Sequence, residues 1–100
     1  MLASADDWDL LARASWDAAA LEILFERHRH YIYRLAWGVL NDDHSADDIV
    51  QEVFLKVRRG KLKAERRAKF TTWLYKVALN TARELLRVKR RGWRDKTVVS

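Results

Sequence analysis

The sequence predicts an all-α fold, a compact bundle of three to four helices, and three observations support this prediction. Proline is absent and glycine occurs only at positions 38, 60 and 92, so little in the chain would interrupt a long helix. Apolar residues recur at steps of three and four, as they do on the buried side of a helix. The chain has 100 residues, of which 49% are hydrophobic, which suits one small domain with a single core.

Two helices are expected in the first 40 residues. A short helix over residues 5–14 comes first, and Asp17 is the expected N-cap of a second that runs to about Leu40. The second helix should end at the turn formed by residues 41–43, which are Asn-Asp-Asp. Apolar positions of the first helix are Trp8, Leu11 and Ala12, and the stripe of the second contains Leu21, Leu24, Phe25, His28, Ile32, Leu35, Ala36 and Val39.

The third helix is bounded by two local signals. Ser45 followed by Asp48 resembles a capping box and predicts the start of the helix. The helix should end near Arg59, because Gly60 is suited to the left-handed conformation that stops a helix. Its expected core residues are Ile49, Val50, Val53, Phe54 and Val57.

A basic loop and a fourth helix complete the predicted domain. Residues 60–70 show no clean apolar period and contain five basic side chains, which predicts a loop. Thr71 or Thr72 is the expected N-cap of a helix that reaches about residue 91. The domain is therefore expected to span residues 1–91, with residues 92–100 as a basic tail or the start of an interdomain linker.

Charge is divided between the two halves of the chain. Residues 1–55 contain four basic and eleven acidic residues, a net charge of −7, whereas residues 56–100 contain sixteen basic and three acidic residues, a net charge of +13. The total of +6 hides this difference. An acidic half joined to a basic half predicts two different partners.

Several classes of protein are excluded or disfavoured. There is no cysteine, which excludes disulfides, thiolate catalysis and cysteine-bound zinc. The longest apolar run, residues 35–40, is far too short for membrane insertion, and the first residues lack the basic start and apolar run of a secretory signal. We therefore expect a soluble, cytoplasmic protein.

A metal-dependent enzyme is the weakest hypothesis. Glu22, Glu26 and His30 follow each other at four-residue steps on one helix face and could in principle bind a divalent ion. A ferritin-like site needs ligands from several helices, and the matching pairs are missing. We expect neither catalysis nor a cofactor. His28 is expected at the edge of the core, His30 and His44 in solvent, and Trp8, Trp16 and Trp37 in helix packing.

The fourth helix is predicted to have a core face and a separate basic face. At about 100° per residue, basic and polar side chains fall in one stripe and apolar ones in another. A cationic stripe of this kind suits phosphate contacts and base stacking, although it could also be only a solvated face. The stripe contains Trp73, Lys76, Asn80, Arg83, Arg87 and Arg90, the core face contains Leu74, Val77, Ala78, Thr81, Leu85 and Val88, and the loop adds Lys61, Lys63, Arg66, Arg67 and Lys69.

The third helix offers a different surface. Asp48, Gln51, Glu52 and Leu55 are spaced so that they form one stripe beside the core residues. An acidic stripe that ends in an exposed leucine could dock a basic partner helix, or it could serve solubility alone.

Two segments carry a resemblance to a known family. Residues 47–57 read DDIVQEVFLKV, and residues 70–80 read FTTWLYKVALN. These two segments and their separation resemble region 2 of bacterial sigma factors, most closely the extracytoplasmic-function (ECF) group of the sigma-70 family. Trp73 is followed by Leu74, which matches that group and differs from the paired tryptophans of housekeeping members. Such proteins normally continue into a second helical domain, region 4, which is absent from these 100 residues.

The resemblance implies a transcription initiation factor and a role for each surface. The acidic stripe would bind the coiled coil of the largest subunit of core RNA polymerase, and the loop with the following helix would bind the non-template strand of the promoter minus-ten element. An anti-sigma factor is a further expected partner. The implied polymerase contacts are Asp48, Gln51, Glu52 and Leu55, and the implied DNA contacts are Lys61, Lys63, Arg66, Arg67, Lys69, Phe70, Thr72, Trp73, Lys76, Asn80, Arg83 and Arg87.

One alternative belongs to a different class. A sigma-like decoy would bind an anti-sigma factor without binding DNA. Such a decoy has no need of a net charge of +13 on residues 56–100, so the charge pattern favours the initiation factor.

Overall fold

The computed structural model describes the backbone of residues 2–99 and the side chains of residues 2–88. A short 3₁₀ helix at Leu2–Ser4 precedes the helices α1 (Asp7–Arg13), α2 (Ala18–Leu40), α3 (Asp43–Arg59) and α4 (Phe70–Val99). No strand occurs among residues 2–99. The predicted all-α class is confirmed.

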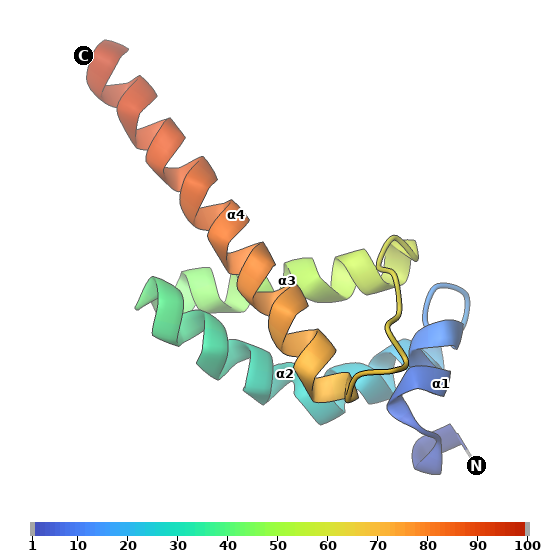
Figure 1. Ribbon diagram of the computed structural model, residues 1–100. Helices are drawn as coiled ribbons and strands as arrows, with labels where there is room; N and C mark the ends of the chain where they lie inside the picture. Colours follow the sequence, from blue (N-terminus) through green and yellow to red (C-terminus); the bar gives the residue numbers. More distant parts are fainter. Residues whose placement is uncertain (1, 100) are drawn as a thin grey trace.

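The helices pack around one core. Helices α2 and α3 run antiparallel, and α4 crosses both before its C-terminal part projects beyond them (Figure 1). Helix α1 lies at the opposite end of the molecule, beside the segment that joins α3 to α4 (Figure 1). This arrangement brings the N-terminal residues next to the predicted basic loop. Within residues 2–99, no helix has the length and apolar character needed to cross a membrane.

The ends of α2 match the prediction, whereas the start of α3 does not. Asp17 caps α2 by accepting a hydrogen bond from the Ala19 amide at 3.1 Å, and Asn41 ends it in the left-handed conformation. Helix α3 begins earlier than expected, because Asp42 accepts hydrogen bonds from the Ser45 amide at 3.1 Å and the Ser45 hydroxyl at 2.5 Å. The predicted Ser45 to Asp48 capping box is therefore wrong. The C-terminal stop at Gly60 is confirmed, with a φ of 68°.

Helix α4 also differs from the prediction at both ends. It begins at Phe70, before the threonines that were expected to cap it, and the Lys69 carbonyl accepts its first helical hydrogen bond from the Trp73 amide at 3.1 Å. The aromatic side chains of this first turn are buried against α1, which explains the earlier start. The backbone remains helical to Val99, so the helix extends beyond the end expected near residue 91.

The core contains most of the predicted residues. All five expected core residues of α3 are buried, and Leu10, which the pattern of α1 did not indicate, is fully buried. Trp16 and Trp37 were expected to pack but are 71% and 44% exposed. Trp16 lies in the turn between α1 and α2, where the Arg13 guanidinium stacks over its ring at 5.3 Å. Val39, in the last turn of α2, and Val88, in an open groove, are also exposed.

Candidate functional site

The acidic stripe, defined as Asp48, Gln51, Glu52 and Leu55, lies on the outer side of α3. Asp48, Gln51 and Leu55 are exposed and Glu52 is half-buried. The buried residues of the same helix occupy its other side and fix its rotation on the bundle. The predicted stripe is thus present as one continuous surface.

A groove of about 430 Å³ separates this stripe from α4. Its walls carry the acidic side chains Asp48, Glu52 and Glu84, and its apolar part includes Leu85 and Val88. A groove with an apolar floor and an acidic rim suits an amphipathic helix with basic flanks.

Lys56 fixes the two walls of the groove to each other. Its ammonium donates to the Thr81 hydroxyl at 2.9 Å and to Glu84 at 3.1 Å. The Thr81 hydroxyl in turn donates to the Val77 carbonyl at 2.7 Å. Lys56 and Glu84 offset each other's charge, so the acidic character of the groove comes from Asp48 and Glu52.

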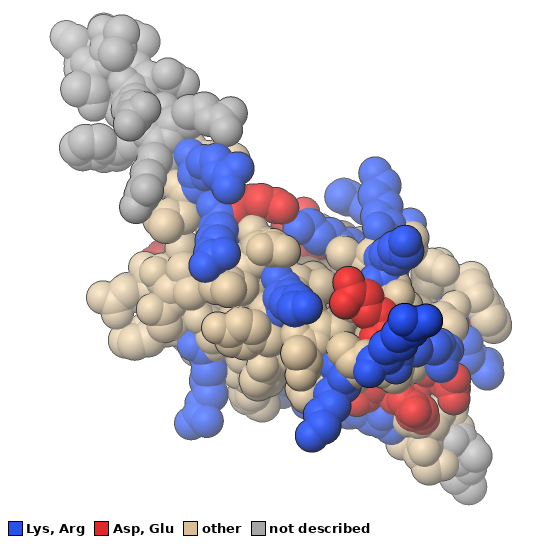
Figure 2. Space-filling model, viewed as in Figure 1, with Lys and Arg blue, Asp and Glu red and all other residues tan. Residues whose placement is uncertain are grey.

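Basic side chains gather on the segment between α3 and α4 and along α4. We define the basic loop as residues 61–69 and the basic face of α4 as Thr72, Lys76, Asn80, Arg83 and Arg87. Figure 2 shows lysine and arginine side chains spread along α4 and over the loop. All the basic residues of both surfaces are exposed. Within the described residues, only Arg66 among them has an ion pair.

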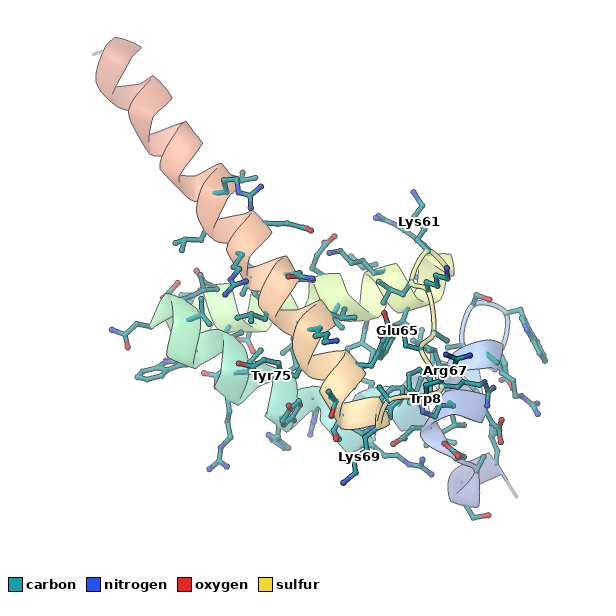
Figure 3. The ribbon with its side chains drawn as sticks, viewed as in Figure 1. Trp8, Lys61, Glu65, Arg67, Lys69 and Tyr75 are labelled. Atoms are coloured by element: carbon teal, nitrogen blue, oxygen red, sulfur yellow. The ribbon has the colours of Figure 1, made fainter. Side chains whose placement is uncertain are left out.

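The lysine side chains at the two ends of the loop point outward from the bundle. Lys61 and Lys69 lie at the two ends of the loop and extend away from the core in different directions (Figure 3). Arg66 instead contacts α1, because its guanidinium lies 3.4 Å from both the Asp9 carboxylate and the Trp8 carbonyl. Arg66, a predicted DNA contact, therefore also ties the loop to α1, and its side chain is still 56% exposed.

Phe70 and Trp73 do not form the exposed aromatic surface that was predicted. They are only 9% and 4% exposed, and their rings lie 5.3 Å apart. Trp8 packs against both rings, and the Trp73 indole donates a hydrogen bond to the Lys63 carbonyl at 2.9 Å. A helical wheel placed Trp73 beside Lys76, but α1 covers the first turn of α4. The two aromatic residues therefore support the loop from inside.

Tyr75 is the exposed aromatic residue that the sequence reasoning missed. It is 44% exposed and lies on α4 next to Lys76 (Figure 3). It follows Thr72 by three residues, which places the two on adjacent turns of the same side of the helix. The sequence could have indicated that Tyr75 is exposed, because residue 75 lies outside the apolar stripe of α4.

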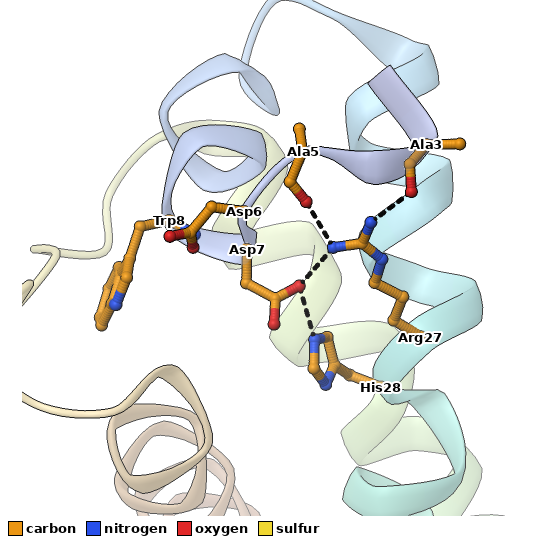
Figure 4. Close-up of polar contacts among 7 residues, drawn as sticks. All are labelled: Ala3, Ala5, Asp6, Asp7, Trp8, Arg27 and His28. Carbon is orange, nitrogen blue, oxygen red and sulfur yellow. Dashed lines mark hydrogen bonds and ion pairs between the residues drawn. The ribbon is translucent and has the colours of Figure 1, made fainter. Parts of the chain in front are cut away.

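A polar cluster holds the N-terminal residues on α2 (Figure 4). The Arg27 guanidinium donates to the carbonyls of Ala3 at 2.6 Å and Ala5 at 2.9 Å, and to the Asp7 carboxylate at 2.9 Å. Nε2 of His28 lies 3.0 Å from the same Asp7 oxygen. Burial raises the pKa of Asp7, but the contacts with His28 and Arg27 lower it by more, so this pKa lies below its ordinary value of 3.8.

The alternative of a metal site at Glu22, Glu26 and His30 gains no support from the described residues. Among the residues that the structure describes, no group of three or more histidine, aspartate and glutamate side chains is placed to hold a metal ion. Glu22, Glu26 and His30 are exposed on α2.

Comparisons with known proteins point to one family. The sigma-70 region 2 family matches residues 24–92. The whole chain is 32% identical to 52% of an RNA polymerase sigma-H factor from Pseudomonas aeruginosa. A segment covering 74% of the chain is 31% identical to 40% of the ECF RNA polymerase sigma factor SigW from Bacillus subtilis, and 78% of the chain is 31% identical to 40% of SigM from Mycobacterium tuberculosis.

The chain thus spans about half the length, or less, of these curated relatives. No solved structure matches it significantly. The family match covers well over half of the 100 residues and includes α3, the basic loop and most of α4. The chain therefore belongs to the sigma-70 region 2 family, as a region 2 domain of the extracytoplasmic-function group.

Proposed function

We propose that this domain joins core RNA polymerase to a melted promoter, binding polymerase through the acidic stripe and the non-template minus-ten strand through the basic loop and the basic face of α4. One observation carries the proposal: surfaces of opposite charge lie on different elements of a single packed core. The contact between Lys56 and Glu84 joins the helices that bear them. A partner on each surface would therefore be held in a defined relation to the other.

The acidic stripe supports binding of a basic helical partner. Asp48 and Gln51 are exposed, and the groove beside them provides apolar area for the partner's own apolar side chains. Leu55, 38% exposed, extends the apolar contact toward α2, where it lines a second hollow with Leu21 and Phe25. The coiled coil of the largest polymerase subunit, which the resemblance implies as partner, is helical.

The basic loop and the basic face support binding of a single strand. Exposed lysine and arginine side chains hold phosphates without reading sequence. Tyr75 offers an aromatic surface beside Lys76, and a base that has left the duplex stack could pack on it. Asn80 adds an amide that can donate to and accept from a base edge.

Charge reversal tests the polymerase contact. We expect Asp48→Arg/Glu52→Arg to bind core polymerase at least about tenfold more weakly, because like charges across an interface are strongly unfavourable. Asp48→Arg alone can be compared with Glu26→Arg, which makes the same change of charge on an exposed residue of α2 outside the stripe. Equal binding by wild type and the double variant in a pull-down titration would contradict this part of the proposal.

Single-strand binding tests the second contact. A labelled minus-ten oligonucleotide should bind with an affinity that falls as salt rises, with a slope of about 0.7 per phosphate contacted. Asn80→Ala and Arg83→Ala should weaken binding and leave helicity unchanged, since both side chains are exposed. Loss of helicity would show that these side chains support the fold. Absence of salt-dependent binding would favour the decoy that binds only an anti-sigma factor.

The groove between α3 and α4 is also the surface that we propose for an anti-sigma factor. Val88 is 59% exposed and lies beyond the acidic stripe, so the groove has apolar area that the polymerase contact need not use. Competition between core polymerase and an anti-sigma factor for the wild-type domain tests this. A Val88→Asp variant that loses the anti-sigma factor and keeps polymerase would separate the two contacts.

A further inference from the structure

The N-terminal strap, defined as residues 2–13, touches the basic loop although it lies outside the family match, which begins at residue 24. It reaches the loop through three successive contacts. Side chains of the strap, α2 and α4 make these contacts, and Arg66 of the basic loop adds a tie of its own to the strap.

The first contact fixes the strap on α2. Arg27 binds two strap carbonyls and the Asp7 carboxylate, and His28 lies 3.0 Å from the same carboxylate oxygen. The Asp7 and Arg27 side chains are 23% and 29% exposed, so the pair is less screened by solvent than an open surface pair. The strap is therefore held at the residue that directly precedes Trp8.

The second contact passes from the strap to α4. The Trp8 ring meets Phe70 edge-on, with the ring centroids 5.0 Å apart, and lies 5.3 Å from Trp73. Trp8 is only 8% exposed. Aromatic rings packed in this way restrict each other's orientation. The position of Trp8 therefore limits how the Trp73 indole can turn.

The third contact passes from α4 to the loop. The Trp73 indole donates to the Lys63 carbonyl at 2.9 Å and so holds the middle of the loop. Arg66 adds a weaker tie, at 3.4 Å, to Asp9 and the Trp8 carbonyl. These side-chain hydrogen bonds join the loop to α1 and α4.

We infer that the strap positions the basic loop for single-stranded nucleic acid, with Asp7 as a positioning residue that acts through Trp8 and the Trp73 hydrogen bond to Lys63. This inference rests on the proposed function for its ligand. Asp7 itself is acidic and contacts Arg27 and His28, so it has no attractive contact to offer a phosphate.

The direction in which Asp7→Ala changes strand affinity distinguishes a positioning role of Asp7 from a purely electrostatic one. Asp7→Ala removes a negative charge, and electrostatics alone would leave binding of an anionic strand unchanged or slightly tighter. If Asp7 positions the loop, the same variant binds a minus-ten oligonucleotide about threefold to tenfold more weakly. Glu22→Ala is the matched control, because it removes the same charge from an exposed residue of α2 for which no polar contact is found in the described structure.

A second measurement follows the loop without DNA. Exchange of the Trp73 indole proton, assigned by its loss in Trp73→Phe, should accelerate in Asp7→Ala and stay unchanged in Glu22→Ala. Trp73→Phe removes the hydrogen bond to Lys63, so adding Asp7→Ala to it should weaken strand binding by less than Asp7→Ala does alone. Arg27→Lys, which keeps the charge and loses the planar fork, is a milder variant that should shift both readouts in the same direction.

Two results would overturn the inference. One is an Asp7→Ala protein, folded by circular dichroism, whose strand affinity and indole exchange equal those of Glu22→Ala. The other is full additivity of Asp7→Ala and Trp73→Phe. If the wild-type domain binds no strand, the proposed function fails, whereas the indole exchange still decides whether the strap controls the loop.

Discussion

The acidic stripe lies on the regular helix α3, whereas the basic loop has no regular structure and is held by side chains from α1 and α4. The stripe needs only a helix whose buried side faces the core. The loop depends on the hydrogen bond from Trp73 to Lys63, and Trp73 is in turn packed against Trp8. Residues far apart in sequence must therefore fold before the loop has its shape.

Because of this difference, the two surfaces should respond differently to substitution. A substitution on the exposed side of α3 should act locally, on the partner of the stripe. A substitution among the buried aromatic residues should act on both the fold and the loop, because the same rings form the core and carry the loop contact. The following predictions test that distinction, from the largest expected effect to the smallest.

Trp8→Ala should have the largest effect. Trp8 is 8% exposed and contacts Phe70 and Trp73, so truncation leaves a cavity in the core and should lower the free energy of unfolding by about 3–5 kcal/mol. That is a large fraction of the stability of a small domain. Urea unfolding followed by circular dichroism measures the change.

Trp16→Ala is the control for Trp8→Ala. Trp16 belongs to the same N-terminal region but is 71% exposed, so its truncation should change stability by less than about 0.5 kcal/mol. Equal destabilisation by the two variants would mean that the aromatic cluster around Trp73 does not depend on Trp8.

Gly60→Ala should destabilise the entrance to the basic loop. Gly60 has a φ of 68°, and an added Cβ would lie 3.3 Å from the Ser15 Cβ. A left-handed residue with a side chain costs about 1–2 kcal/mol, and the short contact adds strain. Thermal unfolding measures the loss, and strand binding should weaken with it.

Gly38→Ala is the matched opposite case. Gly38 lies inside α2, and a Cβ built there meets no atom within 4 Å. Alanine should therefore raise stability by about 0.5–1 kcal/mol, because glycine loses more conformational freedom on folding. If Gly60→Ala lowers stability and Gly38→Ala raises it, the loss in Gly60→Ala comes from the backbone conformation at the loop entrance and not from the removal of a glycine as such.

The helical surfaces were predictable because the period of a helix fixes which residues share a side. The spacing of Asp48, Gln51 and Glu52 was enough to predict the acidic stripe, and the five apolar residues of α3 were all placed correctly in the core. The same reasoning placed Lys76 and Arg83 on an exposed side of α4. In each case the decisive information lies within one helix.

The errors arise where a second element covers or uncovers a helix. A helical wheel for α4 contains no information about α1, so it could not show that Trp8 buries Trp73. Trp37 looked like a core residue by its size, but it lies near the end of α2 and is 44% exposed. The start of α3 was misplaced because both Asp42 and Ser45 can cap, and only the structure shows which one does.

Asp42→Ala tests the local character of α3. Asp42 caps the helix through the Ser45 amide and hydroxyl, so the variant should lose about 1 kcal/mol of stability. Asp48→Ala should change stability by less than about 0.5 kcal/mol, because Asp48 is exposed and does not form the capping box. Strand binding should be unchanged in Asp42→Ala when measured well below its unfolding temperature. A loss of strand affinity there would mean that α3 is not independent of the loop.

The smallest expected effect concerns the hydrogen bond between α2 and α3, in which the Tyr33 hydroxyl donates to Asp43 at 2.7 Å. This bond, with burial and nearby carboxylates, raises the pKa of Tyr33 from 10.0 to about 12. Because the folded value exceeds the unfolded one, the stabilisation is fully present below pH 10.0 and is lost as the pH rises toward 12. Asp43→Asn should lower the pKa of Tyr33 toward 10.0, as measured by tyrosinate absorbance against a Tyr33→Phe reference.

Strand binding at neutral pH should stay unchanged, since Tyr33 is uncharged there and contacts neither the loop nor α1 through this bond. Glu22→Gln, which also removes one negative charge, is the control. A larger change of strand affinity in Asp43→Asn than in Glu22→Gln would show that contacts between α2 and α3 also influence the loop.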